Sequence, residues 1–193
     1  MIGKINFYLD RLFGIEIIGS RPKEAIRFAK KYFNGKKISA VEIGVLRGQN
    51  SEDILKSLNV GKIYLIDPYS KYSDYESDGN YNNLISAEKE ARRKLKKYSG
   101  STIWINEYSD KAVSVISNKV DFIYIDGNHE YEYVKKDLEL YWEKLKNGGI
   151  FSGHDIQHFG VSRALMEFAQ KKNIPVHFGD RRDWWIIKNE SSA

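Results

Sequence analysis

Two short groups of polar residues follow predicted buried strands and have the composition of a reactive site. The first, Asp126-Gly127-Asn128-His129, comes directly after the apolar run 120–125, and the second, Gly153-His154-Asp155, follows the run 150–152. Carboxylates can hold a divalent cation, and an imidazole can accept a proton near neutral pH. The sequence therefore suggests cation or proton chemistry at the ends of two strands.

The two acids are expected to meet at one edge of a sheet. If the strands before Asp126 and Asp155 are parallel neighbours, they lie about 4.8 Å apart and end on the same side. Two carboxylates with open positions suit Mg²⁺ or Mn²⁺, which keep waters or substrate oxygens in their remaining sites. The alternative is that each acid caps the helix that follows it.

The stretch 127–130, Gly-Asn-His-Glu, also matches a metal-ligand signature of metal phosphoesterases. A binuclear site of that kind needs an Asp-x-His box and a Gly-Asp box further upstream. The chain has four histidines, at positions 129, 154, 158 and 177, so none precedes His129, and no Gly-Asp pair precedes it either. Two ligand boxes are missing, which excludes this interpretation.

A glycine turn follows the first predicted strand. Residues 41–48 contain Glu42, Gly44 and Gly48 ahead of a predicted helix. Glycines at such a position let the backbone turn tightly and approach a ligand above the helix N-terminus. The spacing departs from Gly-x-Gly-x-x-Gly, which disfavours NAD. A plain strand-to-helix turn is the alternative.

Asp67 ends the second predicted strand, 62–66. An acid at this place can accept hydrogen bonds from both hydroxyls of an adenosine ribose. The alternative is an aspartate that starts a turn before Pro68. Its position about 20 residues after the glycine turn is the spacing of nucleotide-binding folds and favours the ribose interpretation.

Short apolar runs alternate with helical patterns along the chain. The pattern predicts strands at 38–43, 62–66, 102–105, 120–125 and 150–152, and helices near 51–58, 85–97, 110–117, 130–146 and 161–171. Ser20 is the expected cap of a helix that precedes the first strand. A hairpin of 175–178 and 184–187 follows. The predicted fold is α/β, a doubly wound Rossmann-like seven-stranded sheet, mostly parallel with an antiparallel C-terminal strand.

Length and composition set the remaining expectations. The 193 residues suit a single domain, with a helical N-terminal extension at 1–36 and a Rossmann-like core at 37–189. The net charge of +5 is spread along the chain, which disfavours a nucleic-acid partner. Without cysteine there is no thiolate chemistry. No apolar run is long enough to span a membrane, and we expect a cytoplasmic protein.

These motifs, in this order and spacing, resemble the class I S-adenosylmethionine-dependent methyltransferases, in particular the small-molecule and sugar O-methyltransferase branch whose fourth strand ends Asp-Gly-x-His-x-Tyr. The resemblance runs from about residue 41 to 187. It implies a cofactor site formed by Glu42, Gly44, Gly48, Asp67, Ser109 and Asp126. Asp67 would hold the ribose hydroxyls and Ser109 would lie near the adenine, with a helix cap as an alternative or additional role for Ser109.

The resemblance also implies a divalent cation, Mg²⁺ or Mn²⁺, on Asp126 and Asp155. His154 stands where the family often has a second acid, and it joins the candidate ligands. The cation would lower the pKa of an acceptor hydroxyl, and His129 would accept its proton. The expected acceptor is the hydroxyl of a sugar or another small molecule. A nucleic-acid or protein acceptor, and a cofactor-binding domain without chemistry, are the alternatives. A homo-oligomer is among the assemblies the sequence allows.

The irregular stretch 68–83 contains tyrosines at positions 69, 72, 75 and 81. A loop of this length in a compact domain is typically a functional lid or a disordered insertion. Its tyrosines could offer flat surfaces to an acceptor or pack the loop onto the domain. The sequence leaves both roles open.

Overall fold

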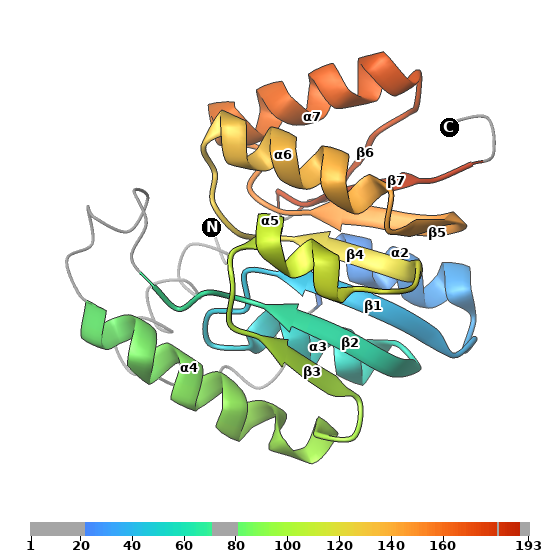
Figure 1. Ribbon diagram of the computed structural model, residues 1–193. Coiled ribbons are helices and arrows are strands. Elements are labelled where there is room, and N and C mark those ends of the chain that lie inside the picture. Colours follow the sequence, from blue (N-terminus) through green and yellow to red (C-terminus); the bar gives the residue numbers. More distant parts are fainter. Residues whose placement is uncertain (1–21, 71–80, 181, 190–193) are drawn as a thin grey trace.

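A seven-stranded mixed sheet forms the centre of the molecule (Figure 1). The computed structural model describes residues 22–70, 81–180 and 182–189. The strand order is β3-β2-β1-β4-β5-β7-β6, with β1 to β5 parallel and with β7 antiparallel to both β5 and β6. The strands are β1 (Ile38–Ile43), β2 (Val60–Ile66), β3 (Thr102–Ile105), β4 (Val120–Ile125), β5 (Leu145–Gly153), β6 (His177–Phe178) and β7 (Trp184–Ile187). This confirms the predicted fold class.

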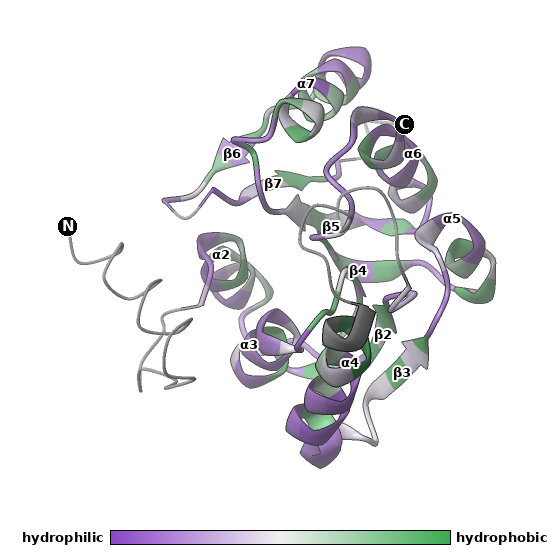
Figure 2. Cartoon of the chain, turned by 90° about the vertical axis from the view of Figure 1, so that its left-hand side faces the viewer, coloured by the Kyte–Doolittle hydropathy of each residue, from purple (hydrophilic) through white to green (hydrophobic). Residues whose placement is uncertain are grey.

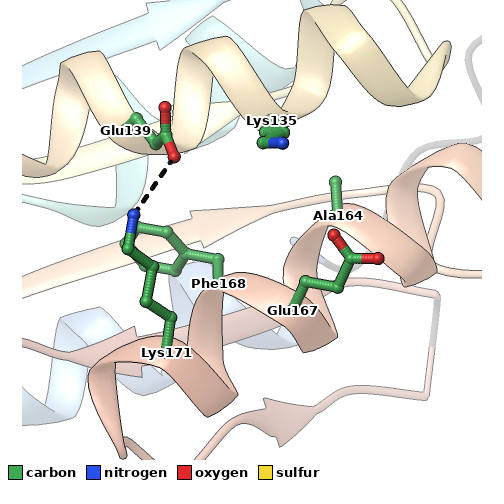
Figure 3. A pocket seen from close by; sticks show the side chains of 6 residues that line it. All are labelled: Lys135, Glu139, Ala164, Glu167, Phe168 and Lys171. Carbon is green, nitrogen blue, oxygen red and sulfur yellow. Dashed lines mark ion pairs between the residues drawn. The ribbon is translucent and has the colours of Figure 1, made fainter.

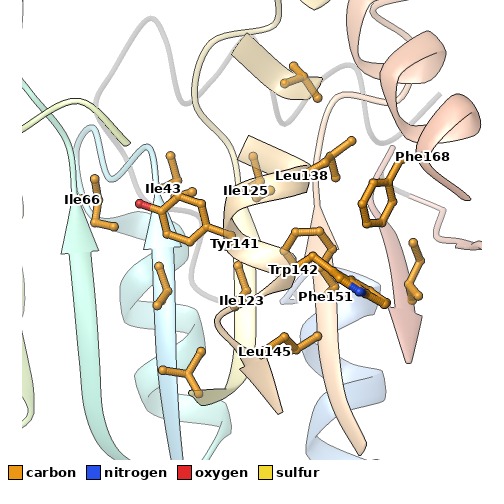
Figure 4. Close-up of a cluster of buried hydrophobic side chains, with 14 of the residues drawn as sticks. Ile43, Ile66, Ile123, Ile125, Leu138, Tyr141, Trp142, Leu145, Phe151 and Phe168 are labelled. Carbon is orange, nitrogen blue, oxygen red and sulfur yellow. The ribbon is translucent and has the colours of Figure 1, made fainter. Parts of the chain in front are cut away.

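Helices cover both faces of the sheet (Figure 2), and the buried apolar side chains form two clusters between the layers. One face packs against α2 (Glu24–Phe33), α3 (Gln49–Ser57) and α4 (Tyr81–Leu95), which the turn η2 (Lys96–Tyr98) extends. The other face packs against α5 (Ser109–Ala112), the turn η3 (Val113–Val115), α6 (Tyr131–Trp142) and α7 (Phe159–Lys172). Figure 4 shows the apolar cluster on the face that α5, α6 and α7 cover, in which Trp142 and Phe168 lie over Phe151 of β5.

The strand order reverses at β1, and this reversal defines the functional edge. β2 pairs with one side of β1 and β4 with the other, so the chain leaves β1 and β4 toward opposite faces. Ligands of open α/β sheets bind in the crevice that such a reversal creates at the carboxyl ends of the strands. The motifs at Gly44, Asp67 and Asp126 all follow strands that end at this edge.

The end of α6 differs from the prediction. The helix was expected to continue to Lys146, but it ends at Trp142, and β5 already begins at Leu145. Leu145 is fully buried and pairs with Val120 of β4. Lys188 donates hydrogen bonds from Nζ to the carbonyl oxygens of Trp142 at 2.7 Å and of Leu145 at 3.3 Å. This tertiary contact satisfies the helix end, and local sequence does not reveal it.

The start of α2 also differs from the prediction. Ser20 lies outside the described residues, and the N-cap of α2 is Lys23, whose side chain makes no capping hydrogen bond. The cap comes instead from Asp183 of the β6–β7 connection, which accepts a hydrogen bond from the Ala25 N–H at 2.5 Å. Asp183 is fully buried. The first turn of α2 is therefore tied to the far end of the sheet.

Candidate active site

Asp126 and Asp155 lie at the same edge of the sheet, as predicted. They follow the neighbouring strands β4 and β5, and His154 stands between them. His154 Nδ1 is 3.7 Å from Asp126 Oδ1 and 3.1 Å from Asp155 Oδ1. The alternative role as helix caps is wrong, because the N-caps of α6 and α7 are Glu130 and His158. The two acids and His154 form one polar cluster.

His129 belongs to this cluster through Asp155. Its Nε2 lies 3.0 Å from Asp155 Oδ2, and its ring stacks on the ring of His158 with centroids 4.5 Å apart. Gly160, in the first turn of α7, presses on the same loop, since a Cβ there would lie 2.2 Å from the His129 carbonyl oxygen. The ring of His129 is therefore held by Asp155 and His158 while 31% of its side chain is exposed.

The charge of Asp155 is held by its neighbours. Burial alone would raise the pKa of Asp155, but hydrogen bonds with His129, His154 and Gln157 outweigh it and hold the pKa well below its usual range. Gln157 donates from Nε2 to Asp155 Oδ1 at 2.8 Å. The backbone of Asp155 has φ +58°, a left-handed conformation that turns its side chain out of the strand direction. Asp155 is therefore a carboxylate at neutral pH.

Lys23 is a member of the site that the sequence did not reveal. Its Nζ lies 2.7 Å from Asp126 Oδ2, and it stands 5.0 Å from the centre of the Tyr124 ring. Both partners of the ion pair are about four-fifths buried, with side-chain exposures of 20% and 21%. They are 103 positions apart in the chain, and no pattern around Lys23 signals the contact.

The cluster can accommodate a divalent cation. One oxygen of Asp126, one of Asp155 and a nitrogen of His154 all lie within 4.8 Å of one another. Two ligands of one Mg²⁺ ion are at most about 4.2 Å apart, twice the usual metal–oxygen distance. The two measured separations from His154 are shorter than this limit. Lys23 and His129 contact the Oδ2 atoms of the two acids, and the Oδ1 atoms face His154, with Gln157 also donating to the Oδ1 atom of Asp155.

The glycine turn is shaped by two close approaches. Gly44 has φ +84°, and a Cβ there would lie 1.9 Å from the carbonyl oxygen of Asp126. Gly48 has φ +72°, and a Cβ there would lie 3.1 Å from Cβ of Ala91 in α4. Gly44 therefore lets the loops after β1 and β4 touch, while Gly48 lets α4 pack beside the start of α3. Cofactor contacts of both glycines stay predictions.

Asp67 braces the glycine turn. Its Oδ2 accepts hydrogen bonds from the N–H groups of Val45 at 3.0 Å and Leu46 at 2.8 Å, and its Oδ1 accepts one from Tyr69 at 2.8 Å. The last bond is the local turn that the alternative interpretation expected. Burial raises the pKa of Asp67, and these three bonds oppose the rise. A hydrogen bond to a ribose stays a prediction.

Among the tyrosines of the stretch 68–83, Tyr69 packs the loop onto the domain. It is buried, and its hydroxyl donates to the carbonyl oxygen of Leu46 at 3.0 Å. Tyr69 and Leu46 both have φ +46°. This tyrosine therefore packs the loop onto the glycine turn. Residues 72 and 75 lie outside the described residues.

Glu42 is fully buried on β1, at the level of Tyr124 on the neighbouring strand. Its Oε1 accepts a hydrogen bond from Asn50 Nδ2 at 2.9 Å, and its Oε2 accepts one from the hydroxyl of Ser51. Burial raises the pKa of Glu42 to about 7, against the effect of these two bonds. The carboxyl group thus faces the first turn of α3, beside the glycine turn, and its contact with a cofactor stays a prediction.

Ser109 lies at the start of α5 but is not its cap, because the N-cap is Tyr108 and makes no side-chain capping bond. The helix-cap interpretation of Ser109 is therefore wrong. Its carbonyl oxygen accepts a hydrogen bond from the hydroxyl of Tyr141 at 2.8 Å, and its side chain bonds with the buried Asp137 of α6. These contacts fix the loop after β3, where adenine was predicted to bind.

A shallow pocket lies between α6 and α7 (Figure 3). Charged side chains of both signs surround it, and Lys171 Nζ lies 3.6 Å from Glu139 Oε1 across it. It is lined by Lys135, Glu139, Ala164, Glu167, Phe168 and Lys171. None of these residues belongs to the cluster at the strand ends, so this pocket is not the candidate active site.

Among the described residues, no helix is both long and apolar enough to cross a membrane.

The comparison with protein families identifies the class of this chain. Residues 41–156 match a family described as a methyltransferase domain. This segment is more than half of the chain and includes both the glycine turn and the Asp126–Asp155 cluster. The protein belongs to this methyltransferase family.

Individual relatives are distant. The chain is 26% identical over 188 residues to "uncharacterized protein R132" of Acanthamoeba polyphaga mimivirus, covering 78% of this chain and 79% of the relative. An O-methyltransferase from Bacillus cereus, solved in complex with SAH, is 13% identical and has a TM-score of 0.61, with 97% of this chain and 100% of that chain covered. An rRNA methylase from Streptococcus thermophilus is 12% identical with a TM-score of 0.60, covering 90% and 99%. At these identities, the two solved structures support the fold alone.

Proposed function

We propose that this protein transfers a methyl group from S-adenosylmethionine to a hydroxyl of a sugar or another small molecule. The observation that carries the proposal is the contact between His129 and Asp155, 3.0 Å long, beside Asp126 at the reversal point of the sheet. A base held by a carboxylate is the arrangement that removes a proton from a weakly acidic hydroxyl. Membership in the methyltransferase family supplies the type of reaction.

The edge formed by β1 and β2 suits the cofactor. Within the described part of the chain, Asp67 Oδ1 accepts one hydrogen bond, from Tyr69, so this oxygen keeps a lone pair that a ribose hydroxyl can use. Gly44 carries no side chain, which lets the backbone of Asp126 approach it and brings the loops after β1 and β4 together beside the proposed cofactor site. When bound, S-adenosylmethionine supplies the electrophilic methyl group. The chain holds it and aligns the acceptor, since placement is most of what a protein contributes to such a transfer.

His129 is proposed as the general base. With Nε2 directed at Asp155, Nδ1 is the ring nitrogen that would take the hydroxyl proton. Asp155 keeps the ring oriented and stabilises the imidazolium form that results, as carboxylates beside catalytic histidines do. The stacked ring of His158 limits rotation of His129.

A divalent cation is proposed on Asp126, His154 and Asp155. When bound, it would act as a Lewis acid that lowers the pKa of the acceptor hydroxyl. Two carboxylate oxygens suit both Mg²⁺ and Mn²⁺, while the imidazole nitrogen is a softer donor that favours Mn²⁺. The residues of the chain then divide their work. Asp126, His154 and Asp155 position the acceptor, and His129 receives its proton.

Calorimetry with SAH, with and without Mn²⁺ or Mg²⁺, tests the cofactor part of the proposal. Methyl transfer to a panel of sugars and catechol-like acceptors, run with EDTA and with each added metal, tests the chemistry. We expect SAH binding and metal-dependent methylation of a small hydroxyl acceptor. Transfer to RNA or to a protein in place of these acceptors would contradict the acceptor class, and absence of SAH binding would contradict the proposal as a whole.

A further inference from the structure

The ion pair between Lys23 and Asp126 has a consequence for the proposed metal site. Asp126 contacts Lys23 with Oδ2 at 2.7 Å and faces His154 with Oδ1 at 3.7 Å. The ammonium group and the proposed cation would thus share one carboxylate from its two sides. Two positive charges on one partly buried carboxylate repel each other more strongly than they would in water.

Contacts between the start of α2 and the β6–β7 connection hold Lys23 in this position. Asp183 caps the first turn of α2, and the N–H of Asp180 donates to Glu24 Oε2 at 3.0 Å. Arg27 Nη2 adds contacts to Glu24 Oε1 at 3.2 Å and Asp180 Oδ1 at 3.6 Å. The backbone of Lys23 is therefore tied to the β6–β7 connection, and its side chain reaches Asp126 from a fixed base.

The surroundings of the ion pair are acidic. Tyr124 lies beneath Lys23, and the acids Glu42, Asp126, Asp155 and Asp183 all raise the pKa of its phenol beyond the large effect of burial. The Tyr124 hydroxyl is buried and has no hydrogen-bond partner among the residues described. It stays neutral and adds no charge. In this acidic environment, the ammonium group of Lys23 compensates Asp126 directly.

We propose that Lys23 is the built-in counter-ion of Asp126 and an antagonist of metal binding at this site. The inference rests on the proposed metal site at Asp126, His154 and Asp155. The charge of Lys23 already compensates the charge of Asp126. An added cation therefore gains less electrostatic binding energy than it would from two uncompensated carboxylates. Because coupling of this kind is reciprocal, a bound cation weakens the contact between Lys23 and Asp126 by the same factor. Lys23 thus keeps metal binding weak and reversible.

Calorimetric titration of the full chain with Mn²⁺ tests the inference without any turnover. The variants are Lys23→Met and Lys23→Gln, which remove the charge, and Lys23→Arg, which keeps it. Lys31→Met is the matched control, since it removes one positive charge from the exposed side of the same helix, about 12 Å further along the axis. Circular dichroism melts show that each variant is folded.

We expect both neutral variants to bind Mn²⁺ about 5- to 150-fold more tightly than the wild type, the usual range of coupling between two sites. Lys23→Arg and Lys31→Met should keep the wild-type affinity. Equal Mn²⁺ affinity in the wild type and both neutral variants would overturn the inference and leave the metal site standing. Absence of Mn²⁺ binding in every variant would overturn both. Binding in the neutral variants alone supports the strongest form of the antagonism.

Discussion

Gly44 and Asp126 are in backbone contact across the carboxyl edge of the sheet, and no Cβ fits between them. A Cβ on Gly44 would lie 1.9 Å from the Asp126 carbonyl oxygen and 2.4 Å from its carbonyl carbon. The loop after β1, which carries the proposed cofactor site, is therefore in direct contact with the loop after β4, which carries the proposed catalytic residues.

Gly44→Ala should lower the free energy of unfolding by about 2 to 4 kcal/mol, because it combines a positive φ with a clash against rigid backbone. Gly35→Ala is the control. Gly35 has a similar φ of +80° but nothing within 4 Å of its Cβ position, so it should cost only about 1 kcal/mol. Urea unfolding of both variants gives the comparison. An equal loss of stability in the two variants would show that the loop after β4 shifts to make room for the new methyl group at no energetic cost.

Asp67→Ala should weaken SAH binding by about 1 to 3 kcal/mol through loss of charge-assisted hydrogen bonds. Part of that loss could come from the glycine turn, which Asp67 braces. Tyr69→Phe separates the two effects, because it removes the bond to the Leu46 carbonyl and leaves the carboxylate intact. We expect Tyr69→Phe to bind SAH nearly as well as the wild type. An unchanged affinity in Asp67→Ala would remove this residue from the cofactor site.

His129→Ala should slow methyl transfer by about 10²- to 10⁴-fold while SAH and Mn²⁺ still bind. Activity should partly recover at high pH, where the acceptor hydroxyl ionises without a base. His177→Ala is the control, since this histidine packs on Trp185 at the antiparallel end of the sheet. The measurement is the pH profile of turnover. A normal rate in His129→Ala would leave residues 126–129 as a turn beside the cofactor.

Asp126→Ala should fail in a different way from His129→Ala. It removes a proposed metal ligand, so stimulation of methyl transfer by Mn²⁺ should disappear. The same substitution releases Lys23 from its ion pair. Turnover with and without EDTA checks the expectation. If the wild type or Asp126→Ala kept, in EDTA, the rate that the wild type has with Mn²⁺, the cation would have no role.

Asp137 predicts a pH dependence of stability. Burial raises its pKa to about 7, against the hydrogen bond with Ser109. Between the unfolded value of 3.8 and this folded value, the folded state binds more protons, so stability falls as the pH rises and then levels off above about 7. The stability of Asp137→Asn relative to the wild type should rise by about 1 to 3 kcal/mol between pH 5 and pH 8. Urea unfolding at both pH values decides, and an advantage independent of pH would contradict the shift.

The parts of the fold that depend on local pattern could be predicted from the sequence. The bounds of β1, β3 and β4 agree with the apolar runs, because buried parallel strands are nearly continuous in apolar residues. The meeting of Asp126 and Asp155 followed from topology, since parallel neighbours end at one edge. The ends of α2 and α6 could not be predicted, because Asp183 and Lys188 satisfy them from distant parts of the chain.

The site was predictable to the same degree. His129, Asp126 and Asp155 stand in two short sequence motifs, and each motif directly follows a predicted strand. Lys23 acts only through a contact with a residue far from it in the chain. A lysine just before a helix is common, so its type carries no signal. Pairing information between distant positions would have been needed to find it.

The capping of α2 by Asp183 links the candidate site to the antiparallel end of the sheet. The two residues that form this hydrogen bond are 158 positions apart, and Asp183 immediately precedes β7, which pairs with β5. Closing so long a loop has an entropic cost that other contacts must offset. The position of the Lys23 ammonium group, and with it the charge balance at Asp126, therefore depends on the last strands of the sheet as well as on α2.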